Sequence, residues 1–289
     1  MSAPAERGPV AELGRYLEIQ TLGLNLPFAV GFLLIAAHGL PPWEPVVLIL
    51  IAFVAARNTG HSFNRWADRE YDARNPRTQT RALVTGRYSA SFALAFALGN
   101  AAVLVVAAGL LNPLAFVLSF VALALIWGYS YTKRFTALTT PFLGLVEAIT
   151  PGAVFIALDG RLPWPVLLAV AALLLWGTAF ETIHSLGDLA SDRALGLRSL
   201  PLRIGSRASL DLIPLLHGAA LTLLALFGMA EGLRLPYFLG LLAMAVVAAA
   251  TDLQLRRSST SPLPAFQRHF LMSTLFAIGI AAALWAPSI

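Results

Sequence analysis

Hydrophobic residues gather into long runs along almost the whole chain, and short polar segments separate them. A helix rises 1.5 Å per residue, so roughly 20 apolar residues cross the hydrocarbon layer of a bilayer. Turn-forming pairs such as Asn112-Pro113 and Asp159-Gly160 fall between the runs. The pattern predicts an all-α, multi-pass membrane protein with nine transmembrane helices, at 18–39, 44–64, 89–111, 114–131, 138–158, 164–187, 208–229, 235–253 and 268–286.

Composition agrees with the membrane class. The chain has 289 residues, of which 58% are hydrophobic and 12% charged, whereas a soluble domain carries about 25% charged residues. It contains no cysteine, which excludes disulfides and thiolate metal sites. The polar N-terminus does not resemble a cleaved signal peptide. The longest polar stretch, 65–88, is too short to fold alone, so we expect a single domain over 1–289, with 1–16 as a cytoplasmic tail.

The basic residues predict the orientation. With the N-terminus in the cytoplasm, all 20 Lys and Arg residues fall on the cytoplasmic side except Arg161 and Arg234. Such asymmetry is what the positive-inside rule expects. We therefore expect a protein of the cell inner (plasma) membrane whose N-terminus and polar loops are cytoplasmic. The same rule accounts for the sequence pI of about 10.1, so we expect the lipid bilayer, and no nucleic acid, as a partner.

Two acidic clusters stand at the cytoplasmic ends of predicted spans. The first holds Asn64, Asp68 and Asp72, and the second holds Asp188 and Asp192. The i, i+4 spacing puts each set on one helix face. Mg²⁺ binds one or two carboxylates together with substrate phosphates, so two facing rows predict a metal site for a diphosphate. The alternative for any single aspartate is a solvated charge paired with a nearby arginine.

Cationic residues near the clusters suit an anion. Arg77 and Arg81 follow the first cluster, and Lys133 ends the fourth predicted span. Arginine forks match phosphate oxygens, although both arginines also serve the positive-inside pattern. For Lys133 the alternative is a lysine that extends from the span to the interface.

Three residues lie one or two turns deeper than the clusters. Arg57 precedes Asn64 by two turns, and an arginine inside a span needs an anionic partner. A substrate carboxylate or Glu181, two turns before Asp188, is the candidate. His184 shares a face with Asp188 as a base, a hydrogen-bond partner or a structural residue, and we interpret His61 as structural.

These motifs resemble the UbiA superfamily of intramembrane prenyltransferases. Its Asn-x-x-x-Asp-x-x-x-Asp signature matches the first cluster, and Asn75-Pro76-Arg77-Thr78 with Arg81 is similar to its continuation. The segments Tyr129–Phe135, Asp188–Asp192 and Gly196–Gly205 resemble further family motifs. Among its branches the chain looks most like 4-hydroxybenzoate polyprenyltransferases and the related enzyme of the futalosine menaquinone route. It departs in reading Arg81-Ala82-Leu83-Val84 where Arg-Pro-Leu-Pro is usual, and Glu181 where Asp is frequent.

The resemblance implies nine helices around a central cavity and a Mg²⁺-dependent transfer of a polyprenyl group from its diphosphate to an aromatic carboxylate acceptor, a benzoate or a naphthoate, in ubiquinone or menaquinone biosynthesis. It implies catalytic and metal-binding roles for Asp68, Asp72, Asp188 and Asp192, with Asn64 as a further ligand. The diphosphate would contact Arg77, Arg81, Lys133 and Arg198, and the acceptor would contact Arg57, Tyr129, Glu181 and His184.

Two alternatives remain open at this point. The acidic rows and the intramembrane arginine also suit a cation-coupled transporter of an anionic solute. The location of the acids at the cytoplasmic ends of the spans, where a soluble diphosphate meets a membrane-embedded tail, favours the enzyme. A UbiA-type enzyme with a haem or lipid acceptor is the other alternative.

Overall fold

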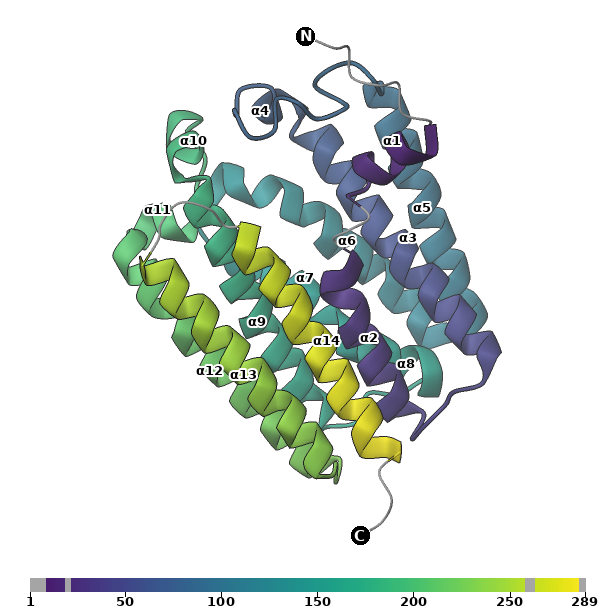
Figure 1. Cartoon of the computed structure of the whole chain (residues 1–289). Helices are drawn as coiled ribbons and strands as arrows, with labels where there is room; N and C mark the ends of the chain where they lie inside the picture. The colour runs from purple at the N-terminus through teal and green to yellow at the C-terminus, as the bar shows by residue number, and fades with distance from the viewer. Residues whose placement is uncertain (1–8, 19–21, 258–262, 286–289) are drawn as a thin grey trace.

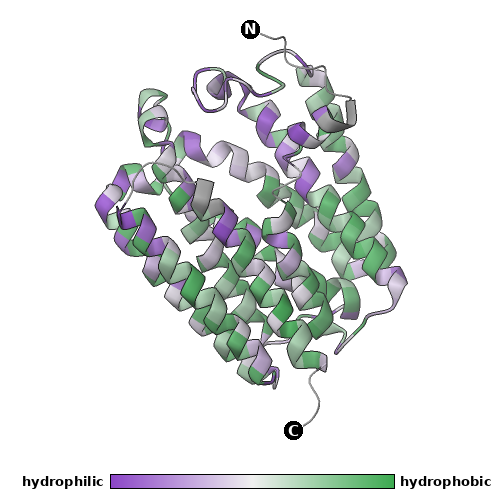
Figure 2. Ribbon diagram, viewed as in Figure 1, coloured by the Kyte–Doolittle hydropathy of each residue, from purple (hydrophilic) through white to green (hydrophobic). Residues whose placement is uncertain are grey.

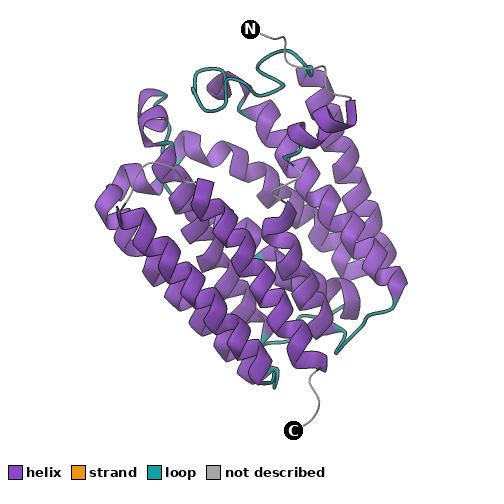
Figure 3. Ribbon diagram, in the orientation of Figure 1, coloured by secondary structure: helices purple, strands orange, loops and turns teal. Residues whose placement is uncertain are grey.

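The computed structural model describes residues 9–18, 22–257 and 263–285. Within these ranges the chain is helical, with loops between the helices (Figure 3). The helices run in the order α1 (Pro9–Tyr16), α2 (Leu22–Ala36), α3 (Trp43–Ala67), α4 (Arg69–Asp72), α5 (Ala90–Leu111), α6 (Pro113–Phe135), α7 (Thr139–Glu147), α8 (Ile149–Asp159), α9 (Val166–Gly187), α10 (Leu189–Ala194), α11 (Leu200–Ile204), α12 (Ser206–Ala230), α13 (Leu235–Arg257) and α14 (Leu263–Trp285).

The predicted all-helical membrane fold is confirmed. Among the described residues, eight segments are long and apolar enough to cross a membrane, and α7 with α8 form one of them. They correspond to eight of the nine predicted spans. The remaining one, 18–39, contains α2, a shorter apolar helix of 15 residues. Residues 19–21 of that span lie outside the described residues.

Four short helices, α1, α4, α10 and α11, were absent from the predicted pattern. They lie at one end of the bundle (Figure 1), where the ribbon is largely hydrophilic, while green hydrophobic residues dominate the long helices (Figure 2). Three of them, α4, α10 and α11, contain four to six residues, too few to give a 3.6-residue periodicity in sequence. The polar loops with the acidic clusters lie with these helices at the same end of the bundle.

The long helices pack as neighbours around the bundle. The most extensive contacts pair α3 with α5, α13 with α14, α9 with α12, α7 with α9, and α2 with α14. The last pair joins the short apolar helix α2 to the last helix, α14, with a hydrogen bond of 3.2 Å from Ser273 Oγ to the Gly23 carbonyl. Phe28 and Phe32 of α2 and Phe276 of α14 lie in the core, with 5.1 and 5.2 Å between ring centroids.

Local signals fix several helix ends. Ser89 caps α5 by accepting from the Phe92 amide at 3.0 Å, and Asn112 caps α6 by accepting from the Ala115 amide at 2.8 Å. Pro113 follows Asn112 at the first position of α6, where its missing N–H costs nothing. These caps place the α5–α6 reversal where the Asn112-Pro113 pair predicts it.

Candidate functional site

One cavity of about 740 Å³ opens among the helices and reaches the polar end of the bundle. Twelve of the thirteen predicted site residues line it. Away from the aspartates its wall becomes apolar, with Ile49, Phe53, Leu104, Val154 and Ile156 among the lining side chains. A single cavity therefore joins a polar mouth to an apolar interior.

The first acidic row keeps its helical register although α3 ends at Ala67. The Asp68 amide bonds the Asn64 carbonyl at 2.8 Å, and the Asp72 amide bonds the Asp68 carbonyl at 2.8 Å. The chain breaks at Asp68 between α3 and α4. Because the i, i+4 bonds continue across the break, Asn64, Asp68 and Asp72 follow one another along the same side of the cavity mouth.

Cations surround this first row. The Asn64 amide donates to Asp68 Oδ2 at 2.8 Å, and Arg134 approaches Asp68 Oδ1 at 3.2 Å. Arg81 donates to both Asp72 oxygens, at 2.8 and 2.7 Å. Asp72 is buried, and a buried carboxylate is stable only with such partners. Arg81, in the segment that follows the first cluster, therefore supplies the counter-charge of Asp72.

The second row is joined to the first by Arg77. Its Nε and NH2 groups donate to the two oxygens of Asp188, at 2.8 and 2.7 Å. Both Asp188 and Asp192 are buried. The Asp192 amide bonds the Asp188 carbonyl at 2.8 Å, so the i, i+4 register also holds here. The two clusters, distant in sequence, thus face one another across one cavity mouth.

Lys133 and Glu181 lie between the rows and the interior. Lys133 Nζ is 3.8 Å from Asp192 Oδ2 and 3.9 Å from Glu181 Oε1. Glu181 also accepts a hydrogen bond of 3.1 Å from the Tyr129 hydroxyl. Lys133 therefore sits where it can contact an anion held between the rows, and Glu181 positions Tyr129.

Burial raises the pKa of the aspartates outside the spans, whereas pairing with a cation lowers it. Burial raises the pKa of Asp68 above its usual value, and the Arg134 hydrogen bond opposes it only in part. Burial also raises the pKa of Asp192, partly offset by the Lys133 charge. For Asp188 burial acts in the same direction, but the hydrogen bonds and charge of Arg77 outweigh it and hold the pKa below its usual value. Arg77 thus favours the charged form of Asp188.

The donor set at the mouth suits a hard divalent cation. Asp192 Oδ2 is buried, lies 3.8 Å from Lys133 Nζ and has no hydrogen-bond partner, so it can still accept a bond at the cavity mouth. Among the described residues no three acidic or histidine side chains form a ready-made metal cage. Mg²⁺ does not require one, because it takes one or two carboxylates plus water and substrate phosphates. The rows therefore fit a cation that an incoming diphosphate completes.

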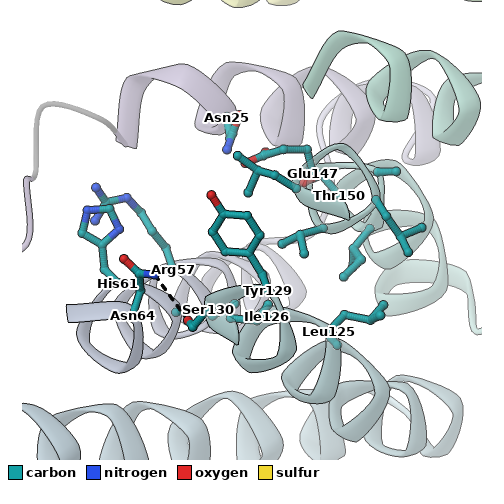
Figure 4. Close-up of a pocket in the computed structure, with 18 of the residues that line it drawn as sticks. Asn25, Arg57, His61, Asn64, Leu125, Ile126, Tyr129, Ser130, Glu147 and Thr150 are labelled. Atoms are coloured by element: carbon teal, nitrogen blue, oxygen red, sulfur yellow. Dashed lines mark hydrogen bonds between the residues drawn. The ribbon is translucent and has the colours of Figure 1, made fainter. Parts of the chain in front are cut away.

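Arg57 lines the same cavity from α3, with a partner that the sequence did not suggest. Its guanidinium donates to the carbonyls of Leu17 and Glu18, both at 2.8 Å. The alternative that Glu181 is the counter-charge of Arg57 is wrong, since Glu181 lies with Tyr129 and Lys133. Glu18 and Glu147 are the carboxylates whose charges act on Arg57. Figure 4 shows Arg57 beside His61, on the other side of Tyr129 from Glu147.

The remaining predicted residues divide into two groups. His184 lines the cavity and its ring contacts Phe180 at 4.9 Å between centroids. His61 also lines the cavity and lies 3.3 Å from Glu18 Oε2. Arg198 does not line the cavity: its side chain donates to the Phe135 carbonyl at 2.6 Å, in a separate depression with Ser199 and Arg203.

Sequence reasoning missed four polar residues of the cavity wall. Arg134 pairs with Asp68, Ser130 contacts Asn64 at 3.4 Å, and Asn25 hydrogen-bonds Glu147. Figure 4 shows Asn25 of α2 pointing at Glu147 at the end of α7. A signal for Glu147 was present, because it is an isolated acid inside the apolar run 138–158 and such a residue indicates function.

Comparison with known proteins identifies a matching protein family. The model of the UbiA prenyltransferase family matches residues 24–286. The 4-hydroxybenzoate octaprenyltransferase of Aromatoleum aromaticum is 34% identical over 215 residues, which cover 74% of this chain and 72% of that protein.

Solved structures agree with the fold. The apo structure of a UbiA homolog from Aeropyrum pernix K1 has a TM-score of 0.78 at 29% identity, covering 92% of this chain and 97% of that one. The structure of a UbiA homolog from Archaeoglobus fulgidus bound to GPP and Mg²⁺ has a TM-score of 0.76 at 19% identity, covering 94% and 99%. The second likeness concerns the fold alone.

Proposed function

Because this chain belongs to the UbiA prenyltransferase family, we propose that it transfers a polyprenyl group from its diphosphate to an aromatic acid of the 4-hydroxybenzoate or naphthoate kind, in quinone biosynthesis. The relative named above is a 4-hydroxybenzoate octaprenyltransferase. Membership of a prenyltransferase family leaves the transporter alternative without support.

The observation that carries the proposal is the division of the cavity into a charged mouth and an apolar interior. Four aspartates and four cations, Arg77, Arg81, Lys133 and Arg134, surround its mouth, and its interior wall is apolar. A polyprenyl diphosphate has the same division, with a strongly anionic head and a hydrocarbon tail. Burial of the tail contributes about 0.8 kcal/mol per CH₂ group, while charge-assisted hydrogen bonds hold the head.

We assign the metal to Mg²⁺, held by Asp68, Asp72, Asp188 and Asp192 with Asn64 as a further ligand. A UbiA homolog of the same fold has been solved with GPP and Mg²⁺, and the buried Asp192 Oδ2, which has no hydrogen-bond partner, is a suitable ligand. When bound, the cation neutralises the charge that develops on the departing diphosphate.

Basic side chains at the cavity mouth would bind the phosphate oxygens beside the metal. Arg77 and Arg81 are already aligned along the two rows by Asp188 and Asp72, and each has further N–H donors for phosphate oxygens. Lys133 supplies a positive charge from the opposite wall. Arg198, directed at the Phe135 carbonyl in a separate depression, takes no part in this proposed site.

We place the acceptor carboxylate at Arg57. The carbonyls of Leu17 and Glu18 fix the orientation of the guanidinium, which carries five N–H donors in all. An aromatic carboxylate in this part of the cavity would therefore find a preorganised cation. The ring would lie near Tyr129 and His184, below the diphosphate.

The long apolar helices make the chain a multi-pass membrane protein. We further propose that it resides in the cell inner membrane with the N-terminus and the cavity mouth in the cytoplasm. The distribution of basic residues supports this orientation, which would give the site access to soluble diphosphate and aromatic acid.

Product analysis tests the function. Purified protein in lipid is incubated with Mg²⁺, a panel of polyprenyl diphosphates and separate acceptors: 4-hydroxybenzoate, a hydroxynaphthoate, haem and a glycerol-phosphate lipid. Mass spectrometry is expected to find a C-prenylated aromatic acid and released diphosphate. Prenylation of haem or lipid alone would move the chain to another branch of the family.

A further inference from the structure

Glu147 is an acidic side chain in the cavity wall that the metal and phosphate site does not use. It is the last residue of α7, inside the span Thr139–Asp159, and it lines the cavity. A carboxyl group in a membrane span is costly unless it has a partner or a function. The hydrogen bond that the described residues give it comes from the side chain of Asn25.

Close packing of α7 on α9 holds the stem of Glu147 in place. A side-chain carbon on Gly177 of α9 would lie 2.9 Å from the Gly144 Cα and 3.0 Å from both Cβ and Cγ of Glu147. The Glu147 stem therefore passes over Gly177, in space that a larger residue there would take, while Glu147 lines the cavity. Four residues on, Pro151 lacks the N–H that would bond the Glu147 carbonyl, and the helix is interrupted at Ala148.

Glu147 and Arg57 lie at comparable depth on opposite walls. Glu147 stands eight residues into α7, which is about 12 Å from the polar end at 1.5 Å per residue. Arg57 stands ten residues before the end of α3, which is about 15 Å. In Figure 4 the Tyr129 ring lies between the Arg57 side and the Glu147 side. The two charged groups thus bound one stretch of the cavity.

The carboxyl group of Glu147 can accept further hydrogen bonds. A carboxylate offers about four lone-pair sites, and Asn25 uses one of them. Thr150, one turn further on, also lines the cavity and adds a hydroxyl to the same wall. The rest of this wall is apolar, with Val146 and Ala153 beside the polar residues. A few polar groups in an otherwise apolar pocket fix the orientation of a bound ligand.

We propose that Glu147, oriented by Asn25, accepts a hydrogen bond from the ring hydroxyl of the aromatic acceptor while Arg57 holds the carboxylate at the other end. This inference rests on the proposed function. The bond orients the ring so that a carbon beside the hydroxyl faces the prenyl diphosphate. It also draws electron density toward that carbon, because a hydroxyl that donates to a carboxylate carries partial phenolate character.

The rival account is structural. Asn25 and Glu147 would then only fasten α2 to α7, and the acceptor hydroxyl would bind elsewhere. Both accounts predict some loss of stability when Glu147 is replaced. They differ in one quantity, the preference of the protein for an acceptor that can donate a hydrogen bond over one that cannot.

The test compares binding of 4-hydroxybenzoate and 4-methoxybenzoate by calorimetry, in protein loaded with Mg²⁺ and a non-reactive prenyl diphosphate analogue. Wild-type protein is expected to prefer the hydroxy acid by about tenfold or more, the range for a hydrogen bond to a charged group. Glu147→Leu should reduce the preference to within about twofold. Glu147→Gln, which keeps an acceptor oxygen without the charge, should fall between them.

Asp159→Asn is the matched control, since Asp159 is an exposed acid in the same span, outside the cavity lining. It should retain the wild-type preference. Binding of the diphosphate analogue verifies that each variant is folded. Full preference in folded Glu147→Leu overturns this inference and leaves the proposed function intact. If wild-type protein neither binds nor prenylates 4-hydroxybenzoate, the proposed function fails and this inference fails with it.

Discussion

Arg77 holds Asp188 in a two-point pair across 111 residues of sequence, with Nε on Oδ1 at 2.8 Å and NH2 on Oδ2 at 2.7 Å. The pair ties the loop after α4 to the junction of α9 and α10. It brings the two aspartate rows to opposite sides of one cavity mouth. The arginine is half exposed, with 52% of its side chain accessible, so it can also reach an incoming anion.

The planar guanidinium of Arg77 is expected to be required for full activity. Arg77→Lys keeps the charge but cannot span two carboxylate oxygens. Loss of one charged hydrogen bond costs about 1.5–3 kcal/mol, so kcat/KM should fall about 10- to 100-fold. Steady-state kinetics and direct binding of a diphosphate analogue measure the effect. An unchanged kcat/KM in Arg77→Lys would show that a point charge suffices. Arg87→Lys, at an exposed pair with Glu12, is the control.

Activity is expected to require a divalent metal bound by both rows. Chelation should abolish turnover, and added Mg²⁺ should restore it. Asp68→Ala, Asp72→Ala, Asp188→Ala and Asp192→Ala should each lower turnover by orders of magnitude in folded protein. Each can be assayed with a fixed prenyl diphosphate over a Mg²⁺ titration.

Glu70→Gln provides the control for these variants. Glu70 lies in sequence between Asp68 and Asp72, but 73% of its side chain is exposed and it contacts Arg69. Because exposed pairs contribute little, Glu70→Gln should retain nearly full activity. Near-wild-type turnover of both variants in one row would remove that row from the metal site.

Arg57→Ala is expected to weaken acceptor binding and leave diphosphate binding almost unchanged. Loss of a charged pair should lower kcat/KM for the acceptor by about 2–3 kcal/mol, and Arg57→Lys should recover only part of it. The double variant Arg57→Ala/Glu181→Ala should not regain acceptor affinity, because Glu181 pairs with Tyr129 and Lys133 instead. Rescue in the double variant would contradict the assignment of Arg57 as carboxylate anchor.

A buried polar chain predicts a stability effect far from the metal rows. His217 of α12 lies 3.0 Å from Asp252 of α13 and 3.3 Å from His269 of α14. The His217 side chain is 2% exposed. His217→Leu would leave Asp252 buried without this partner, which should cost about 3–5 kcal/mol. Thermal unfolding in detergent checks it, and His217→Leu/Asp252→Leu should recover part of the loss. Full stability of His217→Leu would contradict the prediction.

Topology can be tested directly because the chain has no cysteine. Ser206 and Asp159 are exposed at opposite ends of long helices. Ser206→Cys should react with an impermeant maleimide only from the cytoplasmic side, and Asp159→Cys only from the outside. The reverse pattern would invert the proposed orientation, and labelling of both from one side would contradict the span count.

The sequence by itself determined the helices and their chemistry. Apolar runs of bilayer length leave few alternatives, since a backbone in hydrocarbon must satisfy its own hydrogen bonds. Spacing alone placed Asn64, Asp68 and Asp72 in one row, because i, i+4 geometry is local. The family motifs carried the resemblance that the comparisons confirm. The short helices α4, α10 and α11 escaped prediction because so few residues give no periodicity.

Only the tertiary structure decided which residues meet. No local rule pairs Arg77 with Asp188 or turns Arg57 toward the carbonyls of Leu17 and Glu18, because these contacts depend on how separate helices pack. For the same reason the sequence left Glu181 open as a partner of Arg57 and placed Arg198 among the diphosphate contacts, although Arg198 lies in a separate depression. Glu147 was visible as a lone acid in an apolar run, but its place in the cavity wall depends on the packing of α7 on α9, where Gly177 leaves the room that the Glu147 stem occupies.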